Sequence, residues 1–188
     1  MTNVHAAYPS RWSAEILPAR PLILPPRHFT YPAQVEEVER GALEVIIRPA
    51  SAEPFLATFA LGFRDPAVPT GVWSAPDPDE LCALSGGYAY FVRASQPDRF
   101  TLLPLRPVLQ VHVAAEADLL LFIGNRDILA WGAGGQAWQA NAVSSEGITL
   151  NAITATTLHA TGWEMRTDRE FPFALDLATG EPTQTPPR

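Results

Sequence analysis

Short apolar runs separated by turn residues dominate this chain from residue 42 onward. The runs have strand length and recur roughly every 10 residues, with turn signals such as Gly86-Gly87 and Glu146-Gly147 between them. This pattern predicts strands at 43–48, 55–61, 81–84, 88–93, 100–103, 108–113, 119–123, 128–131, 137–140, 148–153, 157–161 and 171–177. Such a series is typical of an all-β meander, sandwich or barrel.

Two of these runs also predict how their side chains are distributed. Every residue of 119–123 is apolar, which is expected of a strand buried on both faces. The run 108–113 alternates instead, so that Leu109, Val111 and Val113 share one face while Gln110 and His112 share the other.

The first part of the chain has a different composition. Six prolines fall within the first 32 residues, and proline fixes φ and removes a backbone donor, so we expect an extended N-terminal arm over 1–41. A short helical turn is predicted at 34–40. The arm should pack along the body, because it carries large apolar residues: Trp12, Ile16, Leu17, Leu22, Ile23 and Leu24. A single β domain over 42–181 and a frayed tail over 182–188 complete the predicted organisation.

Two strand–turn–strand cassettes occur in the second half, at 128–138 (ILAWGAGGQAW) and 173–183 (FALDLATGEPT). Their turn glycines, Gly135 and Gly180, lie 45 residues apart (180 − 135). A period of about 40–45 residues is typical of the stacked sheets of β-propellers. The turn at Gly135 is expected to require a positive φ.

The segment 122–138 resembles the blade motif of pyrroloquinoline-quinone-type propellers, and 173–181 is similar to the Ala-Leu-Asp…Thr-Gly part of that motif. A looser third copy is seen at 86–100. Closed propellers of that family have more blades than this chain can supply, so the resemblance implies a propeller-like arrangement or a two-sheet β-sandwich. Binding of the quinone cofactor is not carried over, and no cofactor is expected. The segment 62–92 also resembles part of an uncharacterised bacterial family.

Charge and composition narrow the range of partners. The net charge is −7, and the 13 basic residues are all arginines that occur singly. This argues against nucleic acid, whose binding depends on clustered cations, and favours a basic protein partner. No apolar run approaches the roughly 20 residues of a membrane-spanning helix, so no membrane partner is expected. A lone cysteine, Cys82, and an N-terminus without signal-peptide features predict a cytoplasmic location.

Candidate chemistry is sparse, and no catalytic residue is assigned. The four histidines lack the spacing of a zinc site, and no metal site is expected. Asp77, Asp79 and Glu80 are interpreted as capping groups rather than calcium ligands. Cys82 is interpreted as a small buried residue rather than a nucleophile.

The aromatic residues are the strongest candidates for binding: Trp73, Trp131, Trp138, Trp163 and Tyr88. Tryptophan and tyrosine bury a large area at a low entropic penalty. The leading hypothesis is a non-enzymatic protein-interaction module with an acidic surface, of which a toxin-neutralising immunity protein is one form. The alternatives are a small-molecule or carbohydrate-binding β domain and an enzyme of another type. Tryptophans lining a concave pocket would favour a small ligand, whereas a flat acidic face would favour a protein.

Overall fold

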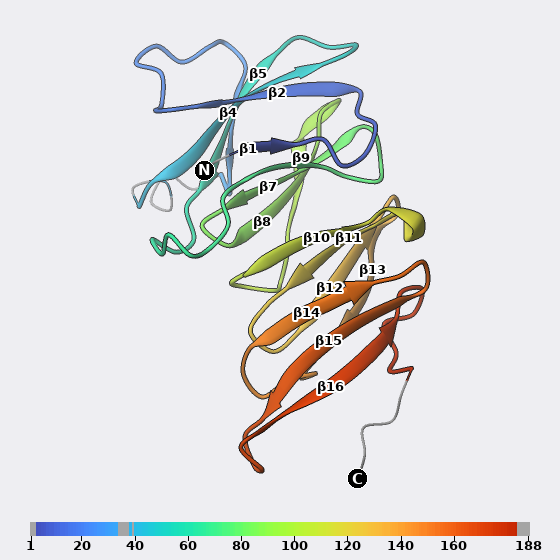
Figure 1. Cartoon of the computed structure of the whole chain (residues 1–188). Coiled ribbons are helices and arrows are strands. Elements are labelled where there is room, and N and C mark those ends of the chain that lie inside the picture. The colour runs from blue at the N-terminus through green and yellow to red at the C-terminus, as the bar shows by residue number, and fades with distance from the viewer. Residues whose placement is uncertain (1–2, 34–37, 39, 184–188) are drawn as a thin grey trace. The chain divides into compact units, whose positions relative to one another are not determined.

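The computed structural model describes residues 3–33, 38 and 40–183 (Figure 1). Within these residues the elements are strands β1 to β16 and one short 3-10 helix at Ala115–Ala117, so the all-β class is confirmed. The helical turn predicted at 34–40 falls mainly outside the described residues. Each strand predicted from the apolar runs overlaps an observed strand. The short strands β1, β2, β3 and β6 were missed.

The strands have the following bounds: β1 Asn3–His5, β2 Trp12–Leu17, β3 His28–Tyr31, β4 Ala42–Pro49, β5 Phe55–Ala60, β6 Gly71–Ser74, β7 Glu80–Ser85, β8 Tyr88–Arg93, β9 Gln96–Leu102, β10 Gln110–Ala114, β11 Leu119–Ile123, β12 Ile128–Gly132, β13 Gly135–Ala140, β14 Ile148–Ile153, β15 Thr157–Glu164 and β16 Arg169–Asp176.

The chain divides into two compact units, Met1–Pro107 and Val108–Arg188. This grouping differs from the predicted arm over 1–41 and single β domain over 42–181. The N-terminal segment supplies β1, β2 and β3 to the sheets of the first unit, because its apolar residues pair with distant strands. In the predicted tail, Pro182 forms an isolated bridge with Leu175, and residues 184–188 lie outside the described range.

The first unit contains two sheets. Sheet A has the order β1-β6-β7-β8-β9, and sheet B has the order β2-β4-β5-β3. Strands β6 to β9 form an antiparallel meander, whereas β1 and β3 pair in parallel with β6 and β5. Residues of both sheets form one hydrophobic core, so two apolar sheet faces are buried against each other. Because β2 and β3 occupy opposite edges of sheet B, the connection between them must cross from one edge to the other.

Alternation within sheet B decides which side chains enter this core. Leu43, Val45 and Ile47 of β4 belong to the core cluster, so Glu44 lies on the opposite, outer face of the sheet. Glu44 is paired in register with Thr58 of β5, which places their side chains side by side on that outer face.

The second unit also contains two sheets with a shared core. Sheet C is the antiparallel meander β10-β11-β12-β13, and sheet D is the meander β14-β15-β16. All residues of β11 are buried, as the apolar run predicted. The antiparallel meanders and the two-sheet packing expected from the sequence are therefore present in the structure.

Strand β10 turns a polar pair toward the core of the second unit. Ala114 belongs to the core cluster, and Gln110 and His112 share its face of the strand. The Gln110 Nε2 donates to the carbonyl of Ile148 at 3.1 Å, and His112 Nε2 lies 2.9 Å from Gln110 Oε1. The polar side chains of β10 thus link sheet C to sheet D, while Val113 on the other face is exposed.

Burial lowers the pKa of His112 from its ordinary value of 6.5. The folded protein therefore keeps the imidazole neutral at pH values where the unfolded chain takes up a proton. Stability should fall as the pH drops through about 6.5, and this contribution should level off below the lowered pKa of the folded state. We expect His112→Gln to show a smaller loss of unfolding free energy than the wild type between about pH 7 and 5, measured by urea unfolding. Parallel pH profiles for the two proteins would contradict this assignment.

The turn between β12 and β13 provides a matched pair of glycines. Gly135 has a φ of +104°, as the sequence predicted, whereas Gly134 lies outside the positive-φ positions and would have open space around an added Cβ. Gly135→Ala should lower the unfolding free energy by about 1–3 kcal/mol, because an L side chain is strained at this φ. Gly134→Ala should change it by less than about 0.5 kcal/mol. Equal melting curves for the two variants would show that the turn tolerates the side chain.

Candidate functional site

The connection between β2 and β3, residues 18–27, is the most exposed apolar segment among the described residues. We call it the 18–27 loop. Its tip carries Leu22, which is fully exposed at 105%, and Ile23, which is 88% exposed. Leu24 is half-buried, and Trp12 earlier in the segment is buried. The expectation that the whole arm packs along the body is therefore wrong at Leu22 and Ile23.

The loop is nevertheless fixed at its C-terminal end. Arg27 donates a hydrogen bond from Nη1 to the carbonyl of Glu53, and its own carbonyl accepts from the backbone amide of Leu56 at 3.1 Å. The Arg27 guanidinium carbon lies 5.7 Å from the centre of the Phe55 ring. Prolines at 18, 21, 25 and 26 restrict the backbone between the two strands. The tip is thus presented on a restrained backbone rather than on a free chain.

A cavity of about 400 Å³ lies at the base of this loop, on the first unit. Its apolar lining comes from Leu17, Pro18, Ala19, Val38 and Ala42, with Gly41 between them. Glu44 and Arg20 contribute its charged groups. Glu44 is only 5% exposed, and its Oε2 accepts a hydrogen bond of 2.6 Å from the Thr58 hydroxyl.

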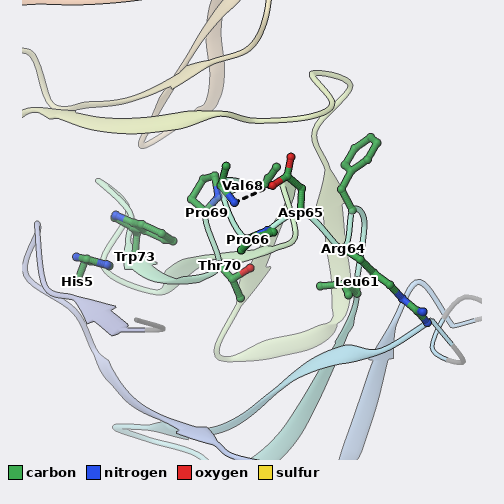
Figure 2. A pocket seen from close by; sticks show the side chains of 11 residues that line it. His5, Leu61, Arg64, Asp65, Pro66, Val68, Pro69, Thr70 and Trp73 are labelled. Carbon is green, nitrogen blue, oxygen red and sulfur yellow. Dashed lines mark hydrogen bonds between the residues drawn. The ribbon is translucent and has the colours of Figure 1, made fainter.

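Trp73, one of the predicted binding residues, lines another cavity of the first unit. The cavity measures about 470 Å³ and is bordered by residues 63–70 (Figure 2). The rings of His5 and Trp73 stack with centroids 4.4 Å apart. Tyr88 does not line this cavity but contacts Phe63, which does, at a ring distance of 5.8 Å.

Several polar groups around the Trp73 cavity form hydrogen bonds within the protein. Asp65 Oδ1 accepts the amide of Ala67 at 2.9 Å, and Thr70 Oγ1 accepts the amide of Gly86 at 3.0 Å. Arg64 donates from Nε and Nη2 to the carbonyl of Arg40. These bonds shape the loop, and the cavity combines the rings of His5, Phe63 and Trp73 with polar groups such as the Asp65 carboxylate.

Trp163 lies in the second unit and lines a cavity of about 430 Å³ on sheet D. Two carboxylates and two hydroxyls accompany it, from Glu146, Glu170, Thr149 and Thr161. Trp163 is paired in register with Glu170, so both side chains project from the same face of the sheet. The cavity therefore combines an aromatic side chain with hydrogen-bonding groups.

Trp131 and Trp138 are buried, with exposed fractions of 5% and 7%. The indole nitrogen of Trp138 donates to the carbonyl of Leu177 at 2.7 Å. A Cβ added to Gly180 would lie 2.6 Å from the Trp138 ring, so only glycine allows this close approach. The two cassettes identified in the sequence therefore pack on each other, and Trp138 joins sheet C to the turn after β16.

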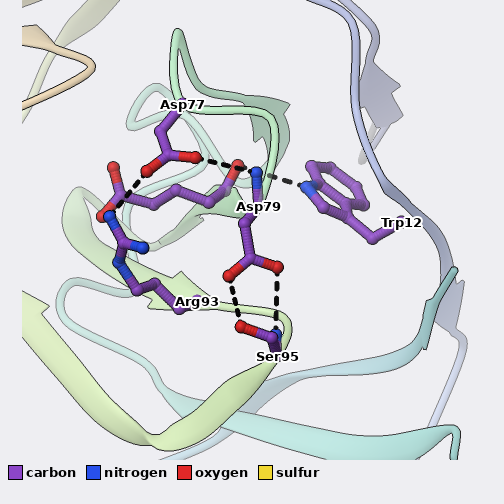
Figure 3. Close-up of polar contacts among 6 residues, drawn as sticks. Trp12, Asp77, Asp79, Arg93 and Ser95 are labelled. Atoms are coloured by element: carbon purple, nitrogen blue, oxygen red, sulfur yellow. Dashed lines mark hydrogen bonds and ion pairs between the residues drawn. The ribbon is translucent and has the colours of Figure 1, made fainter. Parts of the chain in front are cut away.

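The acidic segment at Asp77–Glu80 is stabilised by internal contacts (Figure 3). Asp77 accepts the amide of Asp79 at 3.0 Å and forms an ion pair of 2.6 Å with Arg93. Asp79 accepts both the amide and the hydroxyl of Ser95. The Asp77 and Asp79 carboxylates thus accept backbone amides next to β7, in line with the capping role interpreted from the sequence. Among the described residues no group of three His, Cys, Asp or Glu side chains is placed to hold a metal ion.

Cys82 is fully buried in β7, which matches its interpretation as a small core residue. Burial raises the pKa of its thiol, and the negative charge of Glu80 adds to the effect. A thiol in this environment stays protonated and is a poor nucleophile.

In the part of the chain that the structure describes, no helix has the length and apolar character needed to cross a membrane.

Two groups were missed from the sequence: the exposed pair Leu22 and Ile23, and the buried pair Glu44 and Thr58. A run of apolar residues interrupted by a single glutamate, as in LEVII at 43–47, was the one available signal for Glu44. Nothing in the local sequence distinguishes Leu22 and Ile23 from core residues.

Comparisons with known proteins give no family. No family model matches the chain, and no curated protein matches it. Among solved structures, the chain is similar to the crystal structure of BBS1N in complex with ARL6DN, soaked with mercury, with a TM-score of 0.39 and 15% identity. The match covers 77% of this chain and 45% of that one, so the chain spans less than half of its length. No functional assignment is drawn from a likeness at this level, and the resemblance to quinone-type propeller blades stays a prediction.

The contributions of Trp138 and Trp163 to the free energy of unfolding are expected to differ. Trp138→Ala should lower the unfolding free energy by about 3–5 kcal/mol, because it removes a buried ring and leaves a cavity. Trp163→Ala should lower it by no more than about 1 kcal/mol, because this half-buried ring faces a cavity open to solvent. Chemical denaturation of the two variants provides the test. A Trp163 variant as unstable as the Trp138 variant would show that both rings support the fold.

Proposed function

We propose that this chain is a protein-interaction module that binds a basic partner protein through the 18–27 loop. The observation that carries the proposal is the exposure of Leu22 and Ile23, two consecutive large apolar side chains at the tip of a restrained loop. Exposed apolar groups of this kind, when they gather in one place, are typical of docking surfaces.

The energetics favour such a role. Burying a leucine or isoleucine side chain contributes about 1.5–3 kcal/mol each. The prolines of the loop limit the conformational entropy that is lost when the tip binds. Two adjacent anchors on a restrained backbone can therefore supply much of the affinity of a specific complex.

The charge of the chain argues for a basic partner rather than a second copy. At a net charge of −7, two copies repel each other at long range, whereas a basic protein is attracted and associates faster. The 18–27 loop itself carries Arg20 and Arg27 and no acidic residue, so this attraction comes from the rest of the surface. A toxin-neutralising protein in the cytoplasm is one form of this function. It is supported by the small size, the acidic character and the absence of an assigned catalytic group.

A second function, carbohydrate or small-molecule binding, is favoured by one specific observation. The Trp163 cavity combines an aromatic ring with two glutamates and two threonines. An aromatic face packs against the apolar face of a sugar ring. Carboxylates accept hydrogen bonds from its hydroxyl groups, and threonine hydroxyls both donate to them and accept from them.

Replacing the loop tip tests the main proposal. In Leu22→Ser/Ile23→Ser, the amount of basic partner retained from extracts of the native host should fall by about 30-fold or more, because loss of two anchors removes at least about 2 kcal/mol. The melting temperature should stay unchanged, since both side chains are already exposed. Quantitative mass spectrometry of the retained proteins provides the measurement.

Met165→Ser is the matched control, because Met165 is 63% exposed and belongs to the second unit. It should retain the partner like the wild type. Equal retention by the loop variant would contradict the proposal. Self-association of the wild type in sedimentation experiments, abolished in the loop variant, would instead identify a second copy as the occupant.

A further inference from the structure

We propose that the cavity at the base of the 18–27 loop receives a lysine or arginine side chain of the partner, with the Glu44 carboxylate accepting its charge. This inference rests on the proposed function, because it names the group of the partner that the surface recognises. It adds a specific polar contact to the apolar contact made by Leu22 and Ile23.

The first step of the argument is the state of Glu44. Only 5% of Glu44 is exposed, and the residue lines the cavity. One hydrogen bond reaches it among the described residues, from the Thr58 hydroxyl to Oε2, and it takes part in no ion pair there. A carboxylate has about four acceptor positions and is costly to bury without a cation. Glu44 therefore has capacity for a further donor.

The second step is the origin of this arrangement in the fold. Residues on either side of Glu44, Leu43 and Val45, enter the core, so the strand holds Glu44 on the outer face of sheet B. Its cross-strand neighbours are Leu17 and Thr58. The carboxylate is thus held by a central strand of a sheet, which gives a binding group a precise position.

The third step is the shape and chemistry of the cavity. The cavity has a volume of about 400 Å³ and opens to solvent. Most of the described residues that line it are apolar: Leu17, Pro18, Ala19, Val38 and Ala42. Lysine and arginine have an apolar stem and a charged end, and such side chains pack the stem on apolar surface. An apolar wall with a buried carboxylate complements both parts.

Among the described residues that line the cavity, Arg20 is the other charged one. It is exposed and forms no ion pair with Glu44. An incoming cation would be repelled by Arg20 and attracted by Glu44. Because Glu44 is buried and Arg20 is exposed to screening solvent, the attraction to Glu44 should dominate.

The site also continues the surface already proposed for docking. Pro18, Ala19 and Arg20 form both the start of the 18–27 loop and one wall of the cavity. A partner that covers Leu22 and Ile23 therefore passes close to the cavity. A basic side chain next to two apolar anchors on the partner would match this arrangement.

Small cations provide a probe that needs no identified partner. We expect n-butylguanidinium to cause saturable chemical-shift changes at the amides of Gly41 and Ala42 in NMR titrations, and neutral n-butanol to cause much smaller ones. Glu44→Gln should weaken binding of the cation by about tenfold or more, because the charge-assisted hydrogen bond is lost. Arg20→Gln should leave it unchanged or tighten it. Unsaturable shifts in the wild type, or equal binding by Glu44→Gln, would overturn the inference.

One further variant and one comparison of stabilities keep the result decisive. Ala19→Trp leaves Glu44 intact and should block the probe by filling the cavity from an exposed position, so it serves if Glu44→Gln unfolds. The stability of Arg20→Gln is compared with that of the double variant Arg20→Gln/Glu44→Gln. If Arg20→Gln is destabilised and the double variant is not, Arg20 itself neutralises Glu44, and the inference is overturned.

The two proposals fail separately. In one outcome, the basic partner is lost in the Leu22/Ile23 variant but retained in Glu44→Gln. That result would contradict the cation site and support the docking loop. Alternatively, n-butylguanidinium binds at Glu44 while the loop variant retains the basic partner like the wild type. That result would support the cation site and contradict the proposed function.

Discussion

The strict alternation of side chains along the central strands of sheet B is the constraint on which the first unit depends. Leu43, Val45 and Ile47 must face the core shared with sheet A, and this same period places Glu44 on the outer face. With β2 and β3 at opposite edges of the sheet, the connection between them has to cross it. The buried core and the position of the Glu44 carboxylate thus follow from one register, and the crossing connection follows from the order of the strands.

Much of the fold could be predicted from the sequence, because most strands are continuous apolar runs bounded by turn residues. The fully apolar run 119–123 and the glycine turn at 135 both have the structure expected of them. Strands such as β1 and β3 could not be found in this way. Both are short and form at sheet edges by pairing with distant strands, β6 and β5. Local sequence contains no signal for such pairing.

The candidate site could be predicted only in part. Tryptophans at 138 and 163 look alike in sequence, yet the first joins two sheets and the second lines a cavity. That difference depends on which face of each strand meets a partner sheet. Leu22 and Ile23 resemble core residues, and their exposure results from the path of the loop rather than from their composition. In each case the burial of the side chain depends on long-range topology, which no single segment encodes.

Site-specific photo-cross-linking in the native host tests the central claim most directly. Benzoylphenylalanine would replace Ile23 at the loop tip in one version of the protein and Met165 in another. The account predicts that one basic protein is cross-linked from position 23 and not from position 165. Cross-links to a second copy of this chain, or the same products from both positions, would contradict the claim that the 18–27 loop binds a basic partner.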